Sequence, residues 1–305
     1  SVLYWASGVT PSSLETRRLF RAWLSRHGRP DLDLRIEVSS DEQKIVIQGV
    51  SGRAADFFSA GSSLIPYYKD IGIIADLTPV FQELGLGEPS FYGPALGDCH
   101  LGGRWYALPL NSSLRLYLVN RGCFRRVGLE PPAGPIRFKE FEALGKDYVR
   151  LANAGRPRRE YYFADSAPRE LMLRSLGISY LNETLTGPDF TPDDARFVKV
   201  LELIRKWTDE DHLLPSLSER SSFNTESGSF AGRTGFGAEQ ELFQRGHFAL
   251  LNHGRSSLRL LRDMKPAVDL GALEPPHGGF RNTLAISGLM CCYAGSPNAV
   301  RFRDF

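Results

Sequence analysis

The first forty or so residues alternate between strand-like and helix-like hydrophobic patterns. Residues 2–6 form a β-prone run, and residues 14–24 carry apolar side chains at the spacing of an amphipathic helix. A second strand is predicted at residues 32–38, where apolar side chains take every other position: Leu32, Leu34, Ile36 and Val38. A strand, a helix and a strand in this order form a βαβ unit, which predicts a parallel sheet.

Strands and helices continue to alternate along the rest of the chain. Patterns at helical and strand spacing predict helices at 41–50, 138–151, 167–176 and 191–207, and strands at 161–164 and 283–293, the last broken at Gly288. Residues 215–237 are rich in Ser, Gly and Thr without periodicity, which predicts a long functional or mobile loop. This alternation predicts the α/β fold class.

The stretch from Asp98 to Pro131 organises the chain. Gly102-Gly103 lies between short apolar runs and predicts a hairpin. Pro109 ends the second run, and a strand is predicted at 114–119. A short helix then ends at Gly128, before a proline pair that forces an extended exit.

This order of hairpin, proline, strand, asparagine, short helix and Gly-Leu-x-Pro-Pro resembles the crossover of the family 1 extracellular solute-binding proteins of ABC transporters, the group that includes maltose-binding protein. Five further segments resemble that family in the same order: 51–58, 64–79, 180–183, 243–251 and 270–276. The chain departs from the family pattern at Ala55, where a proline is usual, and at Arg255, where a tryptophan is frequent. The family continues as helices beyond the position of Phe305, so we expect a truncated C-terminus.

The resemblance implies a two-lobe, type II periplasmic-binding-protein fold with a ligand cleft between lobes joined by hinge strands. Lobe 1 is expected to comprise residues 1–117 plus 283–305, and lobe 2 residues 118–282. The implied function is capture of a sugar or oligosaccharide, with hinge closure and delivery to a membrane permease. The resemblance implies a periplasmic or extracellular monomer, anchored in some members through a removed N-terminal segment. It implies no cofactor, no metal and no catalysis.

The composition, with 42% hydrophobic and 24% charged residues, is ordinary for a soluble globular protein. The net charge of +2 and the lack of a basic stripe argue against a nucleic-acid partner. No apolar stretch is long enough to span a bilayer. The four cysteines lack zinc-site spacing and are interpreted as core residues, with a Cys99–Cys123 disulfide as the alternative in an oxidising compartment.

Two other functions are compatible with some of the residues. A glycoside hydrolase needs two carboxylates across the scissile bond, and Asp56, Asp98 and Asp165 are candidates that the sequence cannot pair. A ferric-binding protein of the same broad fold class uses adjacent tyrosines, and Tyr67-Tyr68 and Tyr161-Tyr162 are such pairs. No dinucleotide, Walker A, zinc-protease or nucleophile-elbow motif is present.

Sugar binding needs flat apolar surfaces for pyranose faces and planar donors or acceptors for hydroxyls. Positions matched to the family's strand ends are therefore the predicted ligand-binding residues: Trp5, Ser7, Ser59, Ser62, Asn111, Ser113, Asp165, Arg255 and Arg281. The two arginines hint at an acidic sugar, because a guanidinium clamps a carboxylate in bidentate fashion. Trp5 is expected to be the floor for a sugar ring, with a place in the core as the alternative.

Overall fold

The computed structural model describes residues 2–7, 11–28, 33–38, 41–178, 181–184, 187–190, 194–223 and 238–298. The chain divides into two compact units. Unit 1 comprises Ser1–Ser113 and Ala285–Phe305, and unit 2 comprises Leu114–Leu284. The sequence predicted the crossings after residues 117 and 282. The first structural crossing lies inside one continuous strand, β6 (Leu108–Asn120), where no turn residue marks a boundary.

The sheet of unit 1 has the strand order β2-β1-β3-β12, with the start of β6 beside β12. Its strands are β1 (Val2–Ser7), β2 (Asp33–Val38), β3 (Phe57–Ala60) and β12 (Ala285–Cys292). Its helices are α1 (Pro11–Arg26), α2 (Glu42–Val50), α3 (Ile65–Asp70), α4 (Thr78–Glu83) and α5 (Gly93–Cys99), with short 3-10 turns η1 (Ser62–Leu64) and η2 (Glu88–Ser90). β1 pairs in parallel with β2 and β3, which confirms the predicted βαβ arrangement.

Local chemistry explains two of these elements. The Asp41 carboxylate accepts hydrogen bonds from the N–H groups of Gln43 and Lys44, so it caps α2 at its first turn. Gly102 and Gly103 both have positive φ, at 58° and 77°, and join β4 (His100–Leu101) to β5 (Arg104–Trp105). Positive φ at both central residues is what a tight hairpin turn requires, so the predicted hairpin is confirmed.

The predicted break at Gly288 is wrong, because β12 runs through it without interruption. A Cβ atom at this position would come within 2.9 Å of the amide nitrogen of Asn111, on the neighbouring strand β6. The glycine therefore permits a close approach between strands and does not end one.

Unit 2 is built on the second half of β6, with β10 (Phe248–Gly254), β7 (Tyr162–Ala164) and β11 (Leu270–Leu273). Its helices are α6 (Arg121–Arg126), α7 (Phe138–Ala152), α8 (Arg169–Arg174), α9 (Ala195–Arg205), the π-helical turn η3 (Lys206–Glu210), α10 (Leu217–Ser222), α12 (Ala238–Gln244) and α13 (Ser256–Asp263). A separate hairpin consists of β8 (Leu181–Thr184) and β9 (Gly187–Phe190). Within the region predicted as a loop, residues 217–222 form α10, and residues 224–237 lie outside the described part.

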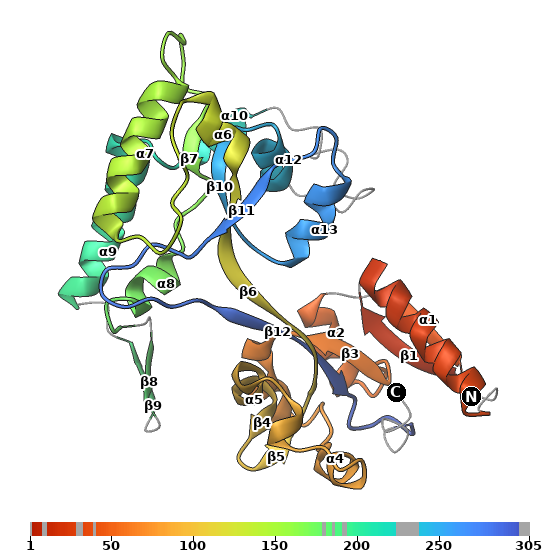
Figure 1. The fold of residues 1–305 in the computed structure, drawn as a ribbon. Helices are drawn as coiled ribbons and strands as arrows, with labels where there is room; N and C mark the ends of the chain where they lie inside the picture. Colours follow the sequence, from red (N-terminus) through yellow and green to blue (C-terminus); the bar gives the residue numbers. More distant parts are fainter. Residues whose placement is uncertain are drawn as a thin grey trace. The chain divides into compact units, whose positions relative to one another are not determined.

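Helices cover both faces of the unit 2 sheet (Figure 1). On one face, Phe141 of α7 and Val200 of α9 belong to the same buried cluster as Tyr117 and Leu250 of the strands. On the other face, Leu242 of α12 belongs to a cluster with strand residues Leu118 and Leu251. The sheet is therefore the middle layer of unit 2.

All four cysteines are free and buried. Cys99 belongs to the core of unit 1 and Cys123 to the core of unit 2. The disulfide considered as an alternative is therefore absent from the structure, and the interpretation of the cysteines as core residues is confirmed. Burial also raises the pKa of the Cys99 thiol to about 11, so this thiol is a poor nucleophile at neutral pH.

Candidate functional site

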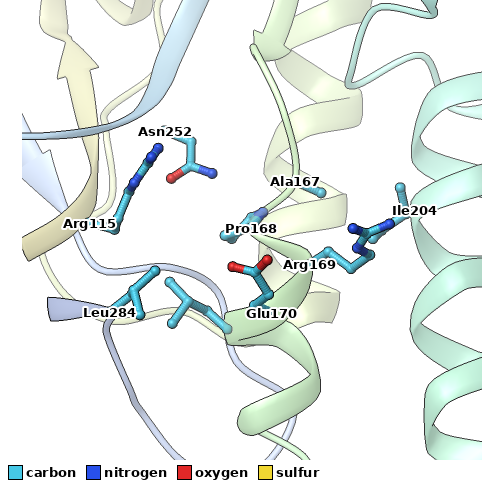
Figure 2. A pocket seen from close by; sticks show the side chains of 9 residues that line it. Arg115, Ala167, Pro168, Arg169, Glu170, Ile204, Asn252 and Leu284 are labelled. Carbon is cyan, nitrogen blue, oxygen red and sulfur yellow. The ribbon is translucent and has the colours of Figure 1, made fainter. Parts of the chain in front are cut away.

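A pocket of about 370 Å³ lies in unit 2, where β7 and β10 end (Figure 2). Its lining combines charged, amide and apolar side chains: Arg115, Ala167, Pro168, Arg169, Glu170, Leu171, Ile204, Asn252 and Leu284. None of these nine described residues is aromatic. Polar contacts, not ring stacking, are therefore what this part of the surface offers to a ligand.

The strand register brings the polar lining residues together. β7 and β10 run parallel, with Phe248 opposite Tyr162, so their carboxyl ends meet at one edge of the sheet. β6 runs antiparallel to β10, and Gly254 lies opposite Arg115. Because alternate residues of a strand share a face, Arg115 and Asn252 lie on the same face of the sheet as diagonal neighbours. Ligands of open α/β sheets bind at such carboxyl ends.

Hydrogen bonds to the buried Asp165 carboxylate hold this edge of the sheet in place. It follows β7 directly and is 4% exposed. Its carboxylate accepts hydrogen bonds from the backbone N–H of Asn252, with 2.6 Å between N and O, and from the Ser166 hydroxyl at 2.8 Å. The Tyr117 hydroxyl donates to the Ser166 carbonyl at 2.7 Å. The turn that leads into Ala167 and Pro168 is thus tied to both β6 and β10.

Burial raises the pKa of Asp165 from 3.8 to about 6, because the carboxylate loses its hydration. The hydrogen bonds from Asn252 and Ser166 and the positive charge of Arg220 act in the opposite direction. Arg220, on α10, also donates to the Asp165 backbone carbonyl. The Asp165 carboxylate already has hydrogen-bond partners within the protein. Asp165 therefore positions the residues around the pocket and does not line it.

Three lining side chains are left without partners. Within the described part of the chain, the guanidinium of Arg115, the amide of Asn252 and the carboxylate of Glu170 make no hydrogen bond or ion pair. Arg115 and Asn252 are half-buried, whereas Glu170 is exposed. A polar group that loses water without gaining a partner costs free energy, so the half-buried Arg115 and Asn252 are poised to bind a polar ligand.

The backbone of Arg115 is fixed by the segment that returns to unit 1. The Arg115 N–H donates to the Leu284 carbonyl at 2.9 Å, and the Thr283 hydroxyl donates to the Arg115 carbonyl at 2.6 Å. The strand therefore holds the start of this side chain rigidly, and the guanidinium extends from it into the pocket (Figure 2).

His253 points to the opposite face of β10 from Asn252. One of its ring nitrogens, Nδ1, lies 2.7 Å from the Ser257 hydroxyl, which also accepts a hydrogen bond from the Gln240 amide at 3.2 Å. Burial is the main cause that lowers the pKa of His253. This imidazole is part of the packing between β10, α12 and α13.

The predicted site residues of unit 2 have three different environments. Asp165 lies under the pocket, as described above. Arg281 forms a bidentate ion pair with Glu274, with 2.8 Å between Nε and Oε2, and is absent from the pocket lining. Arg255 is exposed at the start of α13, has an interaction of its own and is also absent from the lining. The two arginines that suggested an acidic ligand therefore do not line this pocket.

In unit 1 the side chain of Trp5 is 3% exposed and belongs to the hydrophobic core. In the sheet it lies between Ile36 of β2 and Phe57 of β3. This burial favours the core alternative over a floor for a sugar ring. The neighbouring Ser7 ends β1, and its side chain lies outside the described part.

Of the remaining predicted residues of unit 1, Ser59 and Ser62 lie near the end of β3, whereas Asn111 and Ser113 lie inside β6, which continues through Pro109. Ser59 is exposed on β3, and Ser62 is half-buried at the start of η1. Asn111 is exposed on β6 beside Gly288, and Ser113 is half-buried on the same strand. A ligand-binding role for these four residues stays a prediction.

Sequence reasoning missed Arg115, Asn252 and Glu170. A signal existed for the first, because Arg115 is the only charged residue in the apolar run 114–119. A signal existed for the second, because Asn252 is the first polar residue after the run 248–251. No pattern in the sequence pointed to Glu170, which looks like any surface residue of a short helix.

No protein-family model and no curated protein matches the sequence. Solved structures match over the whole chain. An ABC substrate-binding protein from Listeria monocytogenes in complex with cycloalternan has a TM-score of 0.80 and 18% identity, over 100% of this chain and 74% of that chain. An ABC transporter solute-binding protein from Thermotoga lettingae bound with alpha-D-tagatose has a TM-score of 0.76 and 15% identity, over 100% and 76%.

The maltose-bound MalE3 of T. maritima likewise has a TM-score of 0.76 and 16% identity, over 99% of this chain and 75% of that chain. These likenesses show that the chain has the type II periplasmic-binding-protein fold, in agreement with the fold predicted from the sequence. Identities this low establish the fold alone.

One member of each tyrosine pair considered as iron ligands is buried. Tyr162 is buried at 1% exposure in β7, and the ring of Tyr161 lies under the guanidinium groups of Arg126 and Arg156, at 4.4 and 4.6 Å from its centroid. Tyr68 is likewise buried, at 1% exposure. Among the described residues, no group of three or more His, Cys, Asp or Glu side chains is placed to hold a metal ion.

Two of the three carboxylates considered for the hydrolase alternative also have hydrogen-bond partners in the structure. Asp56 accepts hydrogen bonds within unit 1, and Asp165 accepts them within unit 2. Over the described residues, no helix has the length and apolar character needed to cross a membrane.

Proposed function

We propose that the protein is a solute-binding protein that captures a carbohydrate and delivers it to the permease of an ABC transporter. The observation that carries this proposal is the pocket at the carboxyl ends of β7 and β10, with three polar side chains that lack partners among the described residues. Guanidinium, amide and carboxylate groups are the planar donors and acceptors that sugar hydroxyls need. The fold supports it, because solved neighbours carry bound cycloalternan, tagatose or maltose.

Binding without catalysis is part of the proposal. The buried carboxylate of Asp165 is held by Asn252 and Ser166 and does not line the pocket, so the lining offers one carboxylate, Glu170, where glycoside cleavage requires two. We further propose that the protein acts as a monomer, outside the cytoplasmic membrane, where a permease receives its ligand. The fold of the sugar-binding neighbours supports this location.

A sugar screen tests the proposal. The purified protein is heated with uncharged, acidic and amino mono- and oligosaccharides, including maltose, mannobiose and tagatose, while its unfolding is followed. A ligand that binds only the folded state raises the unfolding midpoint. At a concentration 100 times its dissociation constant, it adds about 2.7 kcal/mol to the free energy of unfolding. We expect at least one sugar to raise the midpoint and to be recovered intact after a day. No shift with any sugar, or steady hydrolysis of the bound sugar, would contradict the proposal.

A further inference from the structure

Basic side chains gather at the end of the unit 2 sheet that lies away from the pocket. β6 runs from Arg115 in the pocket to Asn120, where α6 begins (Figure 1). Because a strand rises about 3.3 Å per residue, the start of α6 lies roughly 20 Å from Arg115 along the strand. The Gln244 amide, at the end of α12, donates to the Pro266 carbonyl at 3.1 Å and so ties the segment before β11 to this end. Seven exposed cations form what we call the basic patch: Arg121, Arg125, Arg126, Arg156, Arg158, Arg245 and Lys265.

Contacts around Tyr161 join part of the basic patch. The guanidinium groups of Arg126 and Arg156 lie over the Tyr161 ring, at 4.4 and 4.6 Å from its centroid. Arg126 also donates a hydrogen bond to the Gly246 carbonyl at 3.1 Å, and Arg245 directly precedes that glycine. An aromatic face and a backbone carbonyl orient the Arg126 guanidinium without neutralising its charge.

Carboxylates neutralise only part of the basic patch. Three of them pair with four of the cations: Asp269 with Arg121 and Arg125, Glu160 with Arg156, and Glu241 with Arg245. Among the described residues, Arg126, Arg158 and Lys265 have no carboxylate partner. Seven cations against three carboxylates give this end of unit 2 a formal charge of +4, whereas the whole chain carries +2. Positive charge is therefore concentrated here, and the remainder of the chain is negative overall.

The chemistry of the basic patch favours a surface of phosphate groups. The described residues 121–126, 153–161, 244–247 and 264–269, which carry the patch, include no exposed large hydrophobic side chain. A protein partner would meet an apolar core in the interface, which this patch does not offer. A guanidinium binds phosphate oxygens in bidentate fashion, and clusters of basic residues are attracted to anionic lipids.

We propose that the basic patch binds the headgroups of anionic phospholipids and holds unit 2 against a membrane surface. The pocket lies at the other end of β6 and stays accessible to a sugar in solution. This membrane contact goes beyond the proposed capture of a sugar and does not depend on it. It keeps the protein close to the membrane that carries a permease.

The experiment is co-sedimentation of the protein with vesicles of phosphatidylcholine that contain about 30% phosphatidylglycerol, compared with vesicles of phosphatidylcholine alone. The parent is expected to bind the anionic vesicles at about 0.05 M salt and to lose at least about tenfold in affinity at 0.5 M, because salt screens exposed charges. It should not bind the neutral vesicles. Failure to bind the anionic vesicles, or equal binding to both kinds, overturns the inference.

A triple variant places the contact on the patch. Each basic residue near an anionic surface strengthens binding by about fivefold, so combining Arg125→Gln, Arg158→Gln and Lys265→Gln should lower vesicle affinity by roughly 30- to 100-fold. The matched control removes three exposed cations from the first turn of α7 and from α9: Lys139→Gln, Lys199→Gln and Arg205→Gln. The control should change vesicle affinity by less than about threefold, because its positions are distant from the membrane contact.

Equal losses in the patch variant and the control would show that only net charge matters and would overturn the inference. Soluble polyglutamate serves as the acidic protein probe. Tighter binding to polyglutamate than to anionic vesicles would assign the patch to an acidic protein partner and also overturn the membrane contact. Sugar affinity and the unfolding midpoint of the patch variant should match those of the parent. None of these vesicle results bears on sugar capture, so the proposed function stands or fails separately.

Discussion

The two units each contain a pocket of about 370 Å³ lined by nine residues. The two pockets differ in whether their polar groups have hydrogen-bond partners within the protein. In unit 1 the Asp56 carboxylate accepts hydrogen bonds from the Tyr4 N–H at 2.8 Å, from the Asn298 amide at 3.0 Å and from the Ser296 hydroxyl. Glu37 lines the same pocket. Its carboxylate accepts a hydrogen bond from the Gln48 amide at 3.4 Å and lies 3.9 Å from the Lys44 ammonium. These contacts tie the segment after β12 to β1.

In unit 2 some of the half-buried polar groups that line the pocket have no partner among the described residues. Asp165 has its partners, but Arg115 and Asn252, both half-buried, have none among the described residues. Pocket size therefore does not distinguish a binding site from a fold-holding contact. What distinguishes them is whether half-buried donors and acceptors still lack partners once the fold has formed.

The largest expected effect belongs to the core of unit 1. Trp5→Ala should lower the free energy of unfolding of unit 1 by roughly 3–5 kcal/mol, because it leaves a cavity in a packed core. Sugar affinity of the folded variant should match the parent. Thermal unfolding and titration measure the two quantities, and Trp23→Ala, at a side chain that is 36% exposed, is the milder control. A variant that melts like the parent and binds weakly would restore Trp5 to the site.

Asp165 comes next. Its pKa in the folded protein, about 6, lies above the ordinary 3.8, so its contribution to stability is complete below pH 3.8 and is lost as pH rises through 6. The loss amounts to about 3 kcal/mol. Asp165→Asn keeps an acceptor oxygen and does not ionise. Its stability relative to the parent should therefore rise by roughly 2–3 kcal/mol between about pH 4 and pH 7.

Urea unfolding at both pH values measures this difference. Asp147→Asn serves as the control, because Asp147 is exposed on α7 and its ion pair with Arg150 lies in solvent. A stability difference between Asp165→Asn and the parent that stays constant with pH would show that the buried carboxylate is not strained by desolvation.

Arg115→Ala should weaken sugar binding by about 1.5–3 kcal/mol, which is roughly 10- to 100-fold in Kd. Its stability should stay close to that of the parent, because the guanidinium has no partner among the described residues to lose. Titration calorimetry measures the change, with Arg158→Ala as the matched control. Parent-like affinity in Arg115→Ala would remove this side chain from the site.

The smallest expected effect is at the unit 1 pocket. Arg53 lines that pocket and is exposed, so water already satisfies its guanidinium. Arg53→Ala should change sugar affinity by less than about twofold, in the range of ordinary surface substitutions. A tenfold loss in the same titration would mean that the two pockets do not differ as described.

Most of the fold could be predicted from local patterns in the sequence. The Gly102-Gly103 hairpin and the parallel pairing of β1 with β2 follow from spacing and turn chemistry, and both are found in the structure. Gly288 misled because a glycine inside a strand has two meanings, a break or a close approach. Only the position of Asn111 on the neighbouring strand decides between them.

The site depends on contacts that local patterns do not encode. Arg115 and Asn252 meet because β6 and β10 pair in one register, across more than a hundred residues of chain. A shift of β10 by one residue against β6 would send Asn252 to the face opposite Arg115. Arg255, the residue singled out by resemblance, lies three positions after Asn252, beyond the end of β10. Family position pointed to the end of β10, whereas the register of β10 with β6 places Asn252, and not Arg255, in the pocket lining.

The most direct test is a crystal structure of the protein with the tightest sugar from the screen. We expect a sugar ring in the unit 2 pocket, with hydroxyl oxygens about 2.7–3.2 Å from the Arg115 guanidinium and the Asn252 amide. Asp165 should keep its hydrogen bond to the Asn252 N–H in that complex. A sugar bound with Arg115 and Asn252 free of contact, or seated in the unit 1 pocket beside Asp56, would contradict the assignment.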